Sequence, residues 1–157
     1  MKKAIIFYSY SGNTKRIAER IHSVVGGDIF EVKTKVKYPE DYDTVVEIGK
    51  KEVESGYKPE IEKSDVDLKN YDEIYLGTPV WWYTFAPAMK TFIESADFTG
   101  KTVYPFATNG GWLGRTFKDF EKECKGATVK NGLNVRFDDD TLVTSVRKID
   151  EWAEKTK

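Results

Sequence analysis

Short apolar runs alternate with amphipathic segments along this chain. The first run, residues 4–8, is continuously apolar, as expected for a strand buried on both faces of a sheet. Residues 29–32 alternate apolar and polar side chains and also indicate a strand. In all, the pattern predicts strands at residues 4–8, 29–32, 71–77, 102–108, 128–129 and 133–137.

Apolar residues at helical spacing fill the segments between the strands. Ile17, Ile21 and Val24 recur at this spacing, and the glycine pair at 26–27 is a typical helix end. Further helices are predicted at residues 43–54, 87–96, 116–124 and 144–155. Because strand and helix alternate about five times, the pattern predicts an α/β fold with a parallel sheet and helices on both faces. No repeat or linker divides the chain, which indicates a single domain over residues 1–157.

The loop after the first strand is the first candidate for chemistry, because ligands of such sheets bind beyond the carboxyl ends of the strands. Residues 9–14 (Ser-Tyr-Ser-Gly-Asn-Thr) offer hydroxyls, a side-chain amide and a glycine where a helix begins. Free amides and the partial positive charge of a helix start make a nest suited to a phosphate. The alternative is an ordinary helix cap in which Ser11 or Asn13 satisfies the first amides and binds nothing.

Two further loops carry aromatic and glycine residues. Residues 77–83 (Gly-Thr-Pro-Val-Trp-Trp-Tyr) end in consecutive aromatics that cannot all face one core, which favours a planar ligand. The alternative is that Trp81 and Tyr83 pack under the sheet and Trp82 is half exposed. Residues 108–112 (Thr-Asn-Gly-Gly-Trp) let the backbone approach a ligand closely, or form a plain turn.

Several other functional classes lack their signature here. The chain has neither G-x-x-x-x-G-K-[ST] nor G-x-G-x-x-G, which excludes the P-loop and the usual dinucleotide fingerprint. Phosphorylatable receiver domains need acidic residues after strands one and three, where this chain has Tyr8-Ser9 and Gly77-Thr78. The net charge of −1 gives no basic surface for nucleic acid.

Composition bears on the compartment. The single cysteine, Cys124, can form no internal disulfide, and on an apolar helix face it is expected in the core. The apolar run at 4–8 is too short for a signal sequence, and no stretch approaches a membrane span. We therefore expect a cytoplasmic protein without a membrane or nucleic-acid partner.

The three loops in this order resemble those of the flavodoxin superfamily. The chain is similar to the branch whose second loop reads Gly-x-Pro-hydrophobic-Trp-Trp and whose third reads Thr-x-Gly-Gly. The resemblance extends to Tyr38-Pro39-x-x-Tyr42 and Phe98-x-Gly100-Lys101. It implies a flavodoxin-like, doubly wound, five-stranded parallel sheet of order 2-1-3-4-5 with helices on both faces, and a non-covalently bound FMN.

The resemblance also implies roles for individual residues. The loop at 9–14 would hold the FMN phosphate, residues 78–83 would line the isoalloxazine ring with Trp81 or Trp82 against it, and residues 109–111 would meet its pyrimidine edge through backbone groups. The cofactor-binding residues implied are Ser9, Tyr10, Ser11, Gly12, Asn13, Thr14, Thr78, Pro79, Val80, Trp81, Trp82, Tyr83, Thr108, Asn109, Gly110 and Gly111. No side chain is expected to act catalytically itself, and no metal is expected.

Two departures from electron-carrier flavodoxins bear on the activity. Those carriers commonly place a glycine in the second loop, where a peptide flip stabilises the semiquinone, whereas here no glycine follows Gly77 until Gly100. They are also usually strongly acidic, whereas this chain is nearly neutral. The expected function is electron transfer to a redox partner protein, and the alternative is an FMN-dependent NAD(P)H:quinone-type oxidoreductase acting on small molecules.

Two other features are expected to be structural. His22, the only histidine, lies on the first helix away from the predicted site. The acidic run at 138–140 indicates a solvated turn before the last helix, with Asp140 or Thr141 near its cap.

Overall fold

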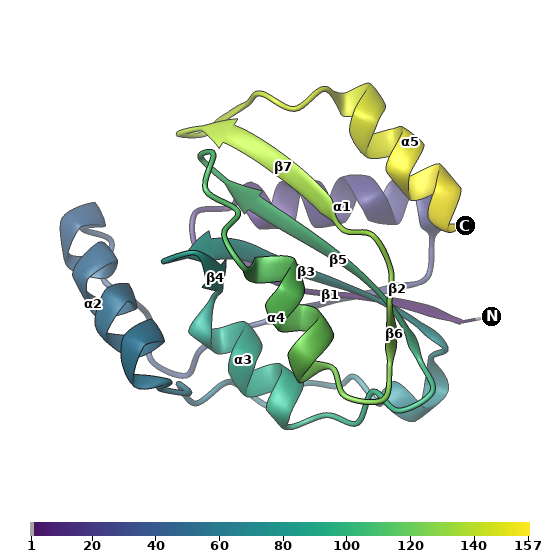
Figure 1. The fold of residues 1–157 in the computed structure, drawn as a ribbon, viewed down its shortest axis with the longest axis horizontal. Coiled ribbons are helices and arrows are strands. Elements are labelled where there is room, and N and C mark those ends of the chain that lie inside the picture. Colours follow the sequence, from purple (N-terminus) through teal and green to yellow (C-terminus); the bar gives the residue numbers. More distant parts are fainter. Residues whose placement is uncertain (1) are drawn as a thin grey trace.

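A computed structural model describes residues 2–157 and places one parallel sheet at the centre of the molecule (Figure 1). Its five long strands run in the order β2-β1-β3-β5-β7, which confirms the predicted order 2-1-3-4-5. These strands are β1 (Lys3–Tyr8), β2 (Asp28–Val32), β3 (Glu73–Trp81), β5 (Thr102–Asn109) and β7 (Leu133–Asp138).

Three two-residue strands extend this sheet, so residues 2–157 contain eight strands rather than five. β4 (Thr84–Phe85) and β8 (Thr141–Leu142) pair antiparallel with β3 and β7. β6 (Thr128–Val129), which the sequence predicted, pairs parallel with β5.

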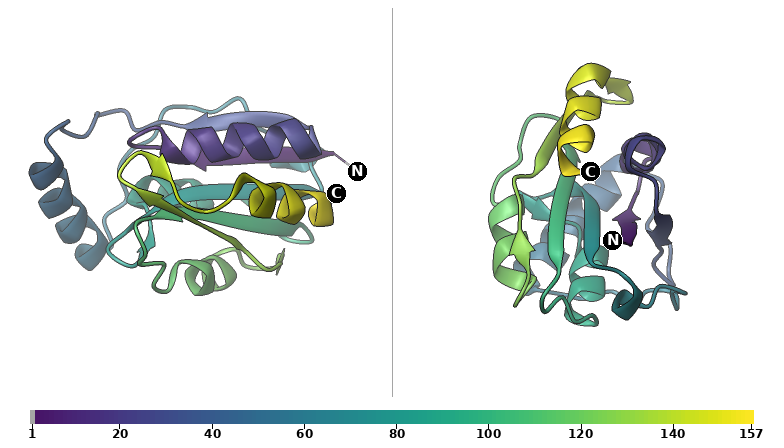
Figure 2. Two further views of the ribbon diagram at one scale, coloured as in Figure 1. Left: turned by 90° about the horizontal axis from the view of Figure 1, so that it is seen from above. Right: turned by 90° about the vertical axis from the view of Figure 1, so that its right-hand side faces the viewer.

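Helices cover both faces of the sheet, as predicted. α1 (Asn13–Val25) and α5 (Val146–Thr156) lie on one face, and α3 (Pro87–Glu94) and α4 (Thr116–Glu123) lie on the other (Figures 1 and 2). α2 (Tyr42–Ser55) stands beyond the carboxyl ends of the strands instead of covering a face, in both views. A short 3-10 helix, η1 (Leu68–Asn70), precedes β3.

Each face has its own buried core. Ile17 and Ile21 of α1 pack with Ile149 of α5 against one side of the sheet. Met89 of α3 and Phe120 of α4 pack against the other. The helical spacing of these residues turns one apolar stripe of each helix toward the sheet, and burial of that stripe is what stabilises the helix.

The contact between Gly77 and Phe106 fixes how the central strands meet. The two residues are direct partners in the parallel register of β3 and β5. The Phe106 ring is fully buried and lies over Gly77, so a Cβ added at Gly77 would overlap the ring. The glycine is therefore required by close packing within β3 and not by a turn.

Some predicted boundaries were wrong. Residues 78–81 belong to β3 rather than to a loop, because Pro79 and Thr78 continue the register with β5. α3 ends at Glu94, two residues before the predicted end at residue 96. α5 is capped by Ser145, whose hydroxyl accepts the Lys148 amide at 3.2 Å, and not by Asp140 or Thr141.

Within residues 2–157, no helix is both long and apolar enough to cross a bilayer.

We expect Gly77→Ala to lower the free energy of unfolding by roughly 1–3 kcal/mol, because the added methyl group overpacks a filled core. Urea denaturation followed by circular dichroism measures the change. In the Phe106→Leu background the same substitution should cost clearly less, since the smaller side chain makes room. An equal cost in both backgrounds would contradict this contact as the reason for the glycine.

Candidate functional site

The predicted ligand loops meet in one cleft of about 770 Å³ at the carboxyl edge of the sheet. This volume lies within the roughly 300–1,000 Å³ of small-molecule and cofactor sites. Eleven of the sequence-predicted residues line it: Tyr10, Ser11, Asn13, Pro79, Val80, Trp81, Trp82, Tyr83, Thr108, Asn109 and Gly110. The remaining predicted residues, Ser9, Gly12, Thr14, Thr78 and Gly111, are not among the residues that line it.

The first loop presents backbone amides to the cleft. Gly12 adopts φ +100° immediately before α1 and supplies no side-chain cap. The hydroxyl oxygen of Ser9 accepts the amides of Gly12 and Lys15, each at 3.2 Å, so neither Ser11 nor Asn13 caps the helix. Since a helix leaves its first amides without intrahelical partners, those of Asn13 and Thr14 stand where an anion can bind.

Side-chain hydrogen bonds tie this loop to its neighbours. Thr14 is buried, and its hydroxyl bonds to that of Thr108 at the end of β5 at 2.7 Å. The side-chain amide of Asn13 donates to the backbone oxygen of Asp139 at 2.9 Å. These two predicted residues therefore join the ends of β1, β5 and β7. Because their side chains are already bonded to the protein, a phosphate there would meet the backbone amides of the loop and the hydroxyl groups of Ser9 and Ser11.

The second predicted loop is a tight hairpin. Trp81 pairs with Thr84 across β3 and β4, so that Trp82 and Tyr83 alone form the turn. Both have positive φ, +48° and +71°. Left-handed conformations cost non-glycine residues of order 1–3 kcal/mol each and cluster at functional sites. The turn exposes 36% of Trp82 and 51% of Tyr83 at the cleft.

Trp81 is held in an aromatic cluster. Its ring meets those of Tyr8, Tyr10 and Tyr38 edge to face, at centroid distances of 6.1, 5.9 and 4.9 Å. Burial raises the pKa of both Tyr8 and Tyr38 well above the ordinary phenol value. These phenols stay neutral at physiological pH, and the Tyr38 hydroxyl donates to the Glu52 carboxylate at 2.6 Å.

Helix α2 forms a wall of the cleft that the ligand-loop analysis missed. The Trp82 indole donates to the Val46 backbone oxygen at 2.9 Å, and the Lys50 ammonium lies 5.4 Å from the centre of the Trp82 ring. Gly49 packs against Trp81, because a Cβ there would lie 3.2 Å from that ring. An apolar helical stripe with a glycine in its middle was the available signal, but it looked like ordinary core.

The third loop is organised by Asn109. Its side-chain amide donates to Asn134 at 2.7 Å, and its side-chain oxygen accepts the Gly111 amide at 2.9 Å. Gly111 has φ +126° and its amide is occupied inside the loop, so Gly110 is the glycine that reaches the cleft. Trp112, 64% exposed, also lines the cleft, although the cofactor-binding residues implied by the resemblance end at Gly111.

Other missed lining residues come from segments without a ligand-binding signature. Tyr42, Val45 and Gly49 are on α2, and Phe137, Asp138 and Asp139 are at the end of β7. Of the predicted acidic turn at 138–140, Asp139 and Asp140 form the turn between β7 and β8, with Asp139 at φ +57°, whereas Asp138 is the last residue of β7. No cluster of three metal-ligating side chains occurs in residues 2–157.

Of the residues assigned to structure, Asp138 and Asp139 line the cleft, whereas His22 and Cys124 lie elsewhere. A ring nitrogen of His22 is 2.9 Å from the Gly27 backbone oxygen, near the C-terminal end of α1. Cys124 is 1% exposed, as predicted, and burial raises its thiol pKa to about 12. Its thiolate is therefore scarce at neutral pH, and the thiol is unsuited to redox chemistry.

The cleft suits a flat ligand with one anionic end. The amides around Gly12 and the start of α1 would receive the anion. The rings of Trp82 and Tyr83, together with Val46, offer apolar walls to a planar group. FMN has both parts, so the residues present fit the cofactor that the sequence implied.

A doubly wound sheet with such a cleft at its carboxyl edge defines a flavodoxin-like protein. The family model described as flavodoxin matches residues 2–155, and the chain belongs to this family. No curated protein sequence is a significant match to the chain.

Solved structures share the fold. A Lactobacillus acidophilus flavoprotein, in a complex with FMN, is 29% identical with a TM-score of 0.77, covering 97% of this chain and 98% of that chain. A Bacteroides eggerthii protein named as a candidate flavoprotein is 26% identical with a TM-score of 0.81, covering 98% and 96%. Megasphaera elsdenii flavodoxin, 20% identical with a TM-score of 0.60 and 98% coverage of both chains, shares the fold alone.

We expect Trp82→Phe to loosen α2, because it removes the donor to the Val46 carbonyl and keeps a ring in the cleft. A net hydrogen bond is worth about 0.5–1.5 kcal/mol, so amide exchange in α2 should quicken roughly two- to tenfold. Hydrogen exchange measured by mass spectrometry reports this. The control is Trp112→Phe, in an exposed residue of the same cleft, and equal effects of both variants would argue against the bond.

Proposed function

We propose that this protein binds FMN non-covalently through the cleft and transfers electrons. The observation that carries the proposal is the meeting of an amide-rich, left-handed glycine turn with a wall of neutral aromatic rings. Membership of the flavodoxin family and the FMN complex of the Lactobacillus acidophilus protein support it.

The phosphate end of the ligand would be held by neutral donors. The Ser9 oxygen already accepts two amides, which leaves its hydroxyl proton free to donate to a phosphate oxygen. Ser11 lines the cleft with its own hydroxyl, and the first amides of α1 add a positive partial charge. This loop therefore selects a ligand with an anionic group over the same ring system without one.

The ring end of the ligand would lie among aromatic side chains. Trp81 is fixed by its tyrosine cluster, whereas Trp82 and Tyr83 present exposed ring surface for stacking. Bound FMN supplies one- and two-electron redox chemistry, and the protein orients and tunes it. Apolar walls disfavour a negative charge in the cleft, so the protein sets the potential at which electrons are accepted.

The natural electron source and acceptor define two versions of this function. In the first version, the protein exchanges electrons with a redox partner protein. In the second, it takes electrons from NAD(P)H and passes them to a quinone-type acceptor. The net charge of −1 favours the second, because it gives little electrostatic steering toward a basic partner protein. We place the protein in the cytoplasm on its composition, with one buried cysteine and no internal disulfide.

We expect the purified protein to quench FMN fluorescence on titration, and Gly12→Ala to weaken FMN binding about tenfold. Alanine is strained at φ +100°, and the amides around it lose their arrangement. Riboflavin, which lacks the phosphate, should bind both proteins equally. Absence of quenching by the unaltered protein would contradict the proposed function.

The matched control for this experiment is Gly100→Ala. Gly100 also has positive φ (+77°) with nothing within 4 Å of an added Cβ, but neither it nor its chain neighbours line the cleft, whereas Gly12 lies between the lining residues Ser11 and Asn13. It should lower stability by a similar amount without changing FMN affinity. A loss of FMN affinity in this control as well would remove the phosphate interpretation of Gly12.

Mixing the FMN-loaded protein anaerobically with NADPH separates the two versions of the function. If the cleft accepts a nicotinamide beside the flavin, we expect the visible absorbance band of oxidised flavin to bleach within seconds. Bleaching that requires an added reductase partner would instead assign the protein as a carrier. Stopped-flow absorbance is the measurement.

A further inference from the structure

In the Trp82–Tyr83 turn of the cleft, two consecutive non-glycine residues have positive φ, which strains the backbone. Tight hairpin turns with two positive φ values favour Asn-Gly, since these residues tolerate the left-handed region. Here two bulky aromatics occupy both positions. Such a turn persists only where its surroundings over-determine it.

The start of α4 supports the turn backbone directly. The Arg115 amide donates to the Tyr83 carbonyl oxygen at 2.8 Å, so that carbonyl takes up one of the amides at a helix start. Gly114, with φ +58°, packs so closely that a Cβ there would overlap the Tyr83 backbone. The segment before α4 is therefore shaped to the turn.

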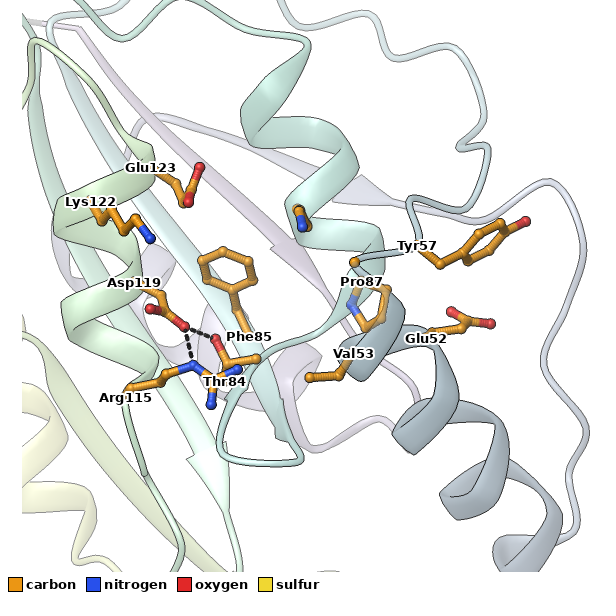
Figure 3. Close-up of a pocket in the computed structure, with 12 residues that line it drawn as sticks. Glu52, Val53, Tyr57, Thr84, Phe85, Pro87, Arg115, Asp119, Lys122 and Glu123 are labelled. Atoms are coloured by element: carbon orange, nitrogen blue, oxygen red, sulfur yellow. Dashed lines mark hydrogen bonds and ion pairs between the residues drawn. The ribbon is translucent and has the colours of Figure 1, made fainter.

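A second contact holds the strand that leaves the turn. The Thr84 hydroxyl donates to the Asp119 carboxylate, and the same carboxylate oxygen accepts from Arg115 Nε at 3.0 Å. Thr84 is 6% exposed and the Asp119 side chain is 21% exposed, so this bond is partly shielded from water. Figure 3 shows Thr84, Arg115 and Asp119 bound together on one side of a small hollow.

Across that hollow of about 190 Å³ lie Glu52 and Val53 of α2 (Figure 3). The turn is thus held from two sides, by α4 through the Tyr83 carbonyl and by α2 through the Trp82 indole. The support from α4 acts on the backbone, whereas that from α2 acts on one side chain.

From these contacts we infer that Gly114, Arg115, Asp119 and Thr84 form a brace that keeps the Trp82–Tyr83 turn left-handed and so positions both rings in the cleft. Asp119 and Thr84 are positioning residues, because neither lines the cleft. The inference rests on the proposed function for the ligand that the rings meet, but the brace itself is a property of the protein without ligand.

The ion pair is the weakest part of the brace. The Arg115 side chain is 56% exposed, and exposed ion pairs contribute little to stability. The partly shielded Thr84–Asp119 bond, the Arg115 amide and the Gly114 contact therefore carry the effect. Removing the Thr84 hydroxyl is a sharper test than removing the charge on Arg115.

The test compares Thr84→Val, which keeps the shape of the side chain, and Asp119→Ala, which removes the acceptor, with the unaltered protein. We expect each to raise the FMN dissociation constant about tenfold, to shift the midpoint potential of bound FMN, and to quicken exchange of the Trp82 indole proton in the ligand-free protein. Fluorescence titration, anaerobic redox titration and NMR measure these, and urea denaturation reports whether the fold is kept.

Glu151→Gln is the matched control, because Arg147 and Glu151 form an ion pair with the same spacing and the same 3.0 Å distance on α5. It should leave all three readouts unchanged. In a Tyr83→Gly background, where the turn needs less support, Thr84→Val should change FMN affinity less than about twofold.

The outcomes separate the brace from the proposed function. Unchanged affinity, potential and indole exchange in Thr84→Val and Asp119→Ala would overturn the brace and leave FMN binding intact. If the unaltered protein does not bind FMN, the proposed function fails, and indole exchange in the ligand-free variants still decides whether the brace exists.

Discussion

The cleft depends on one constraint, which is that four parallel strands end at the same edge of the sheet. β1, β3, β5 and β7 each deliver a loop or turn to that edge, although these segments are far apart in sequence. Close packing at the centre of the sheet maintains this register, and Gly77 beneath the Phe106 ring is its tightest point. Any slip between β3 and β5 would separate the aromatic turn from the first loop.

Hydrogen bonds at the strand ends convert that register into a defined site. The buried Thr14–Thr108 bond couples the first loop to the end of β5, and the Asn13–Asp139 bond couples it to the end of β7. Because the Thr14 and Thr108 hydroxyls are buried, each would incur a desolvation cost if it lost its partner. The loop therefore holds its shape before any ligand arrives, which lowers the entropic cost of binding.

The spacing of apolar residues and the glycine and polar residues between elements were enough to predict the fold, because each long strand and helix carries a clear apolar pattern. The strand order came from the resemblance, and the structure confirms it. The end of β3 was misjudged, since Pro79 and the three aromatics after it look like a loop, while the backbone of residues 78–81 continues the ladder with β5 and β4. The brief strands β4 and β8 are too short to give a pattern.

The candidate site was predictable where one loop carries its own signature, and not where tertiary packing supplies the wall. The stripe of Val45, Val46 and Gly49 on α2 could not be distinguished from core by sequence, because a helix that covers a ligand and one that covers a sheet need the same apolar face. Likewise, Asn109 and Asn13 have the chemistry of ligand donors, yet their side-chain amides bind the protein itself.

The aromatic turn shows how strain and position are related in this cleft. A glycine in the turn would relieve the cost of positive φ, but it would remove a ring from the wall and let the peptide units move. Trp82 and Tyr83 keep both rings, and the strain is offset by bonds from α2 and from the start of α4. The lack of a glycine in this segment is a departure from electron-carrier flavodoxins that was already visible in the sequence. In the structure, the same absence accompanies a turn whose backbone is fixed from outside, so its conformation depends on α4 as much as on its own residues.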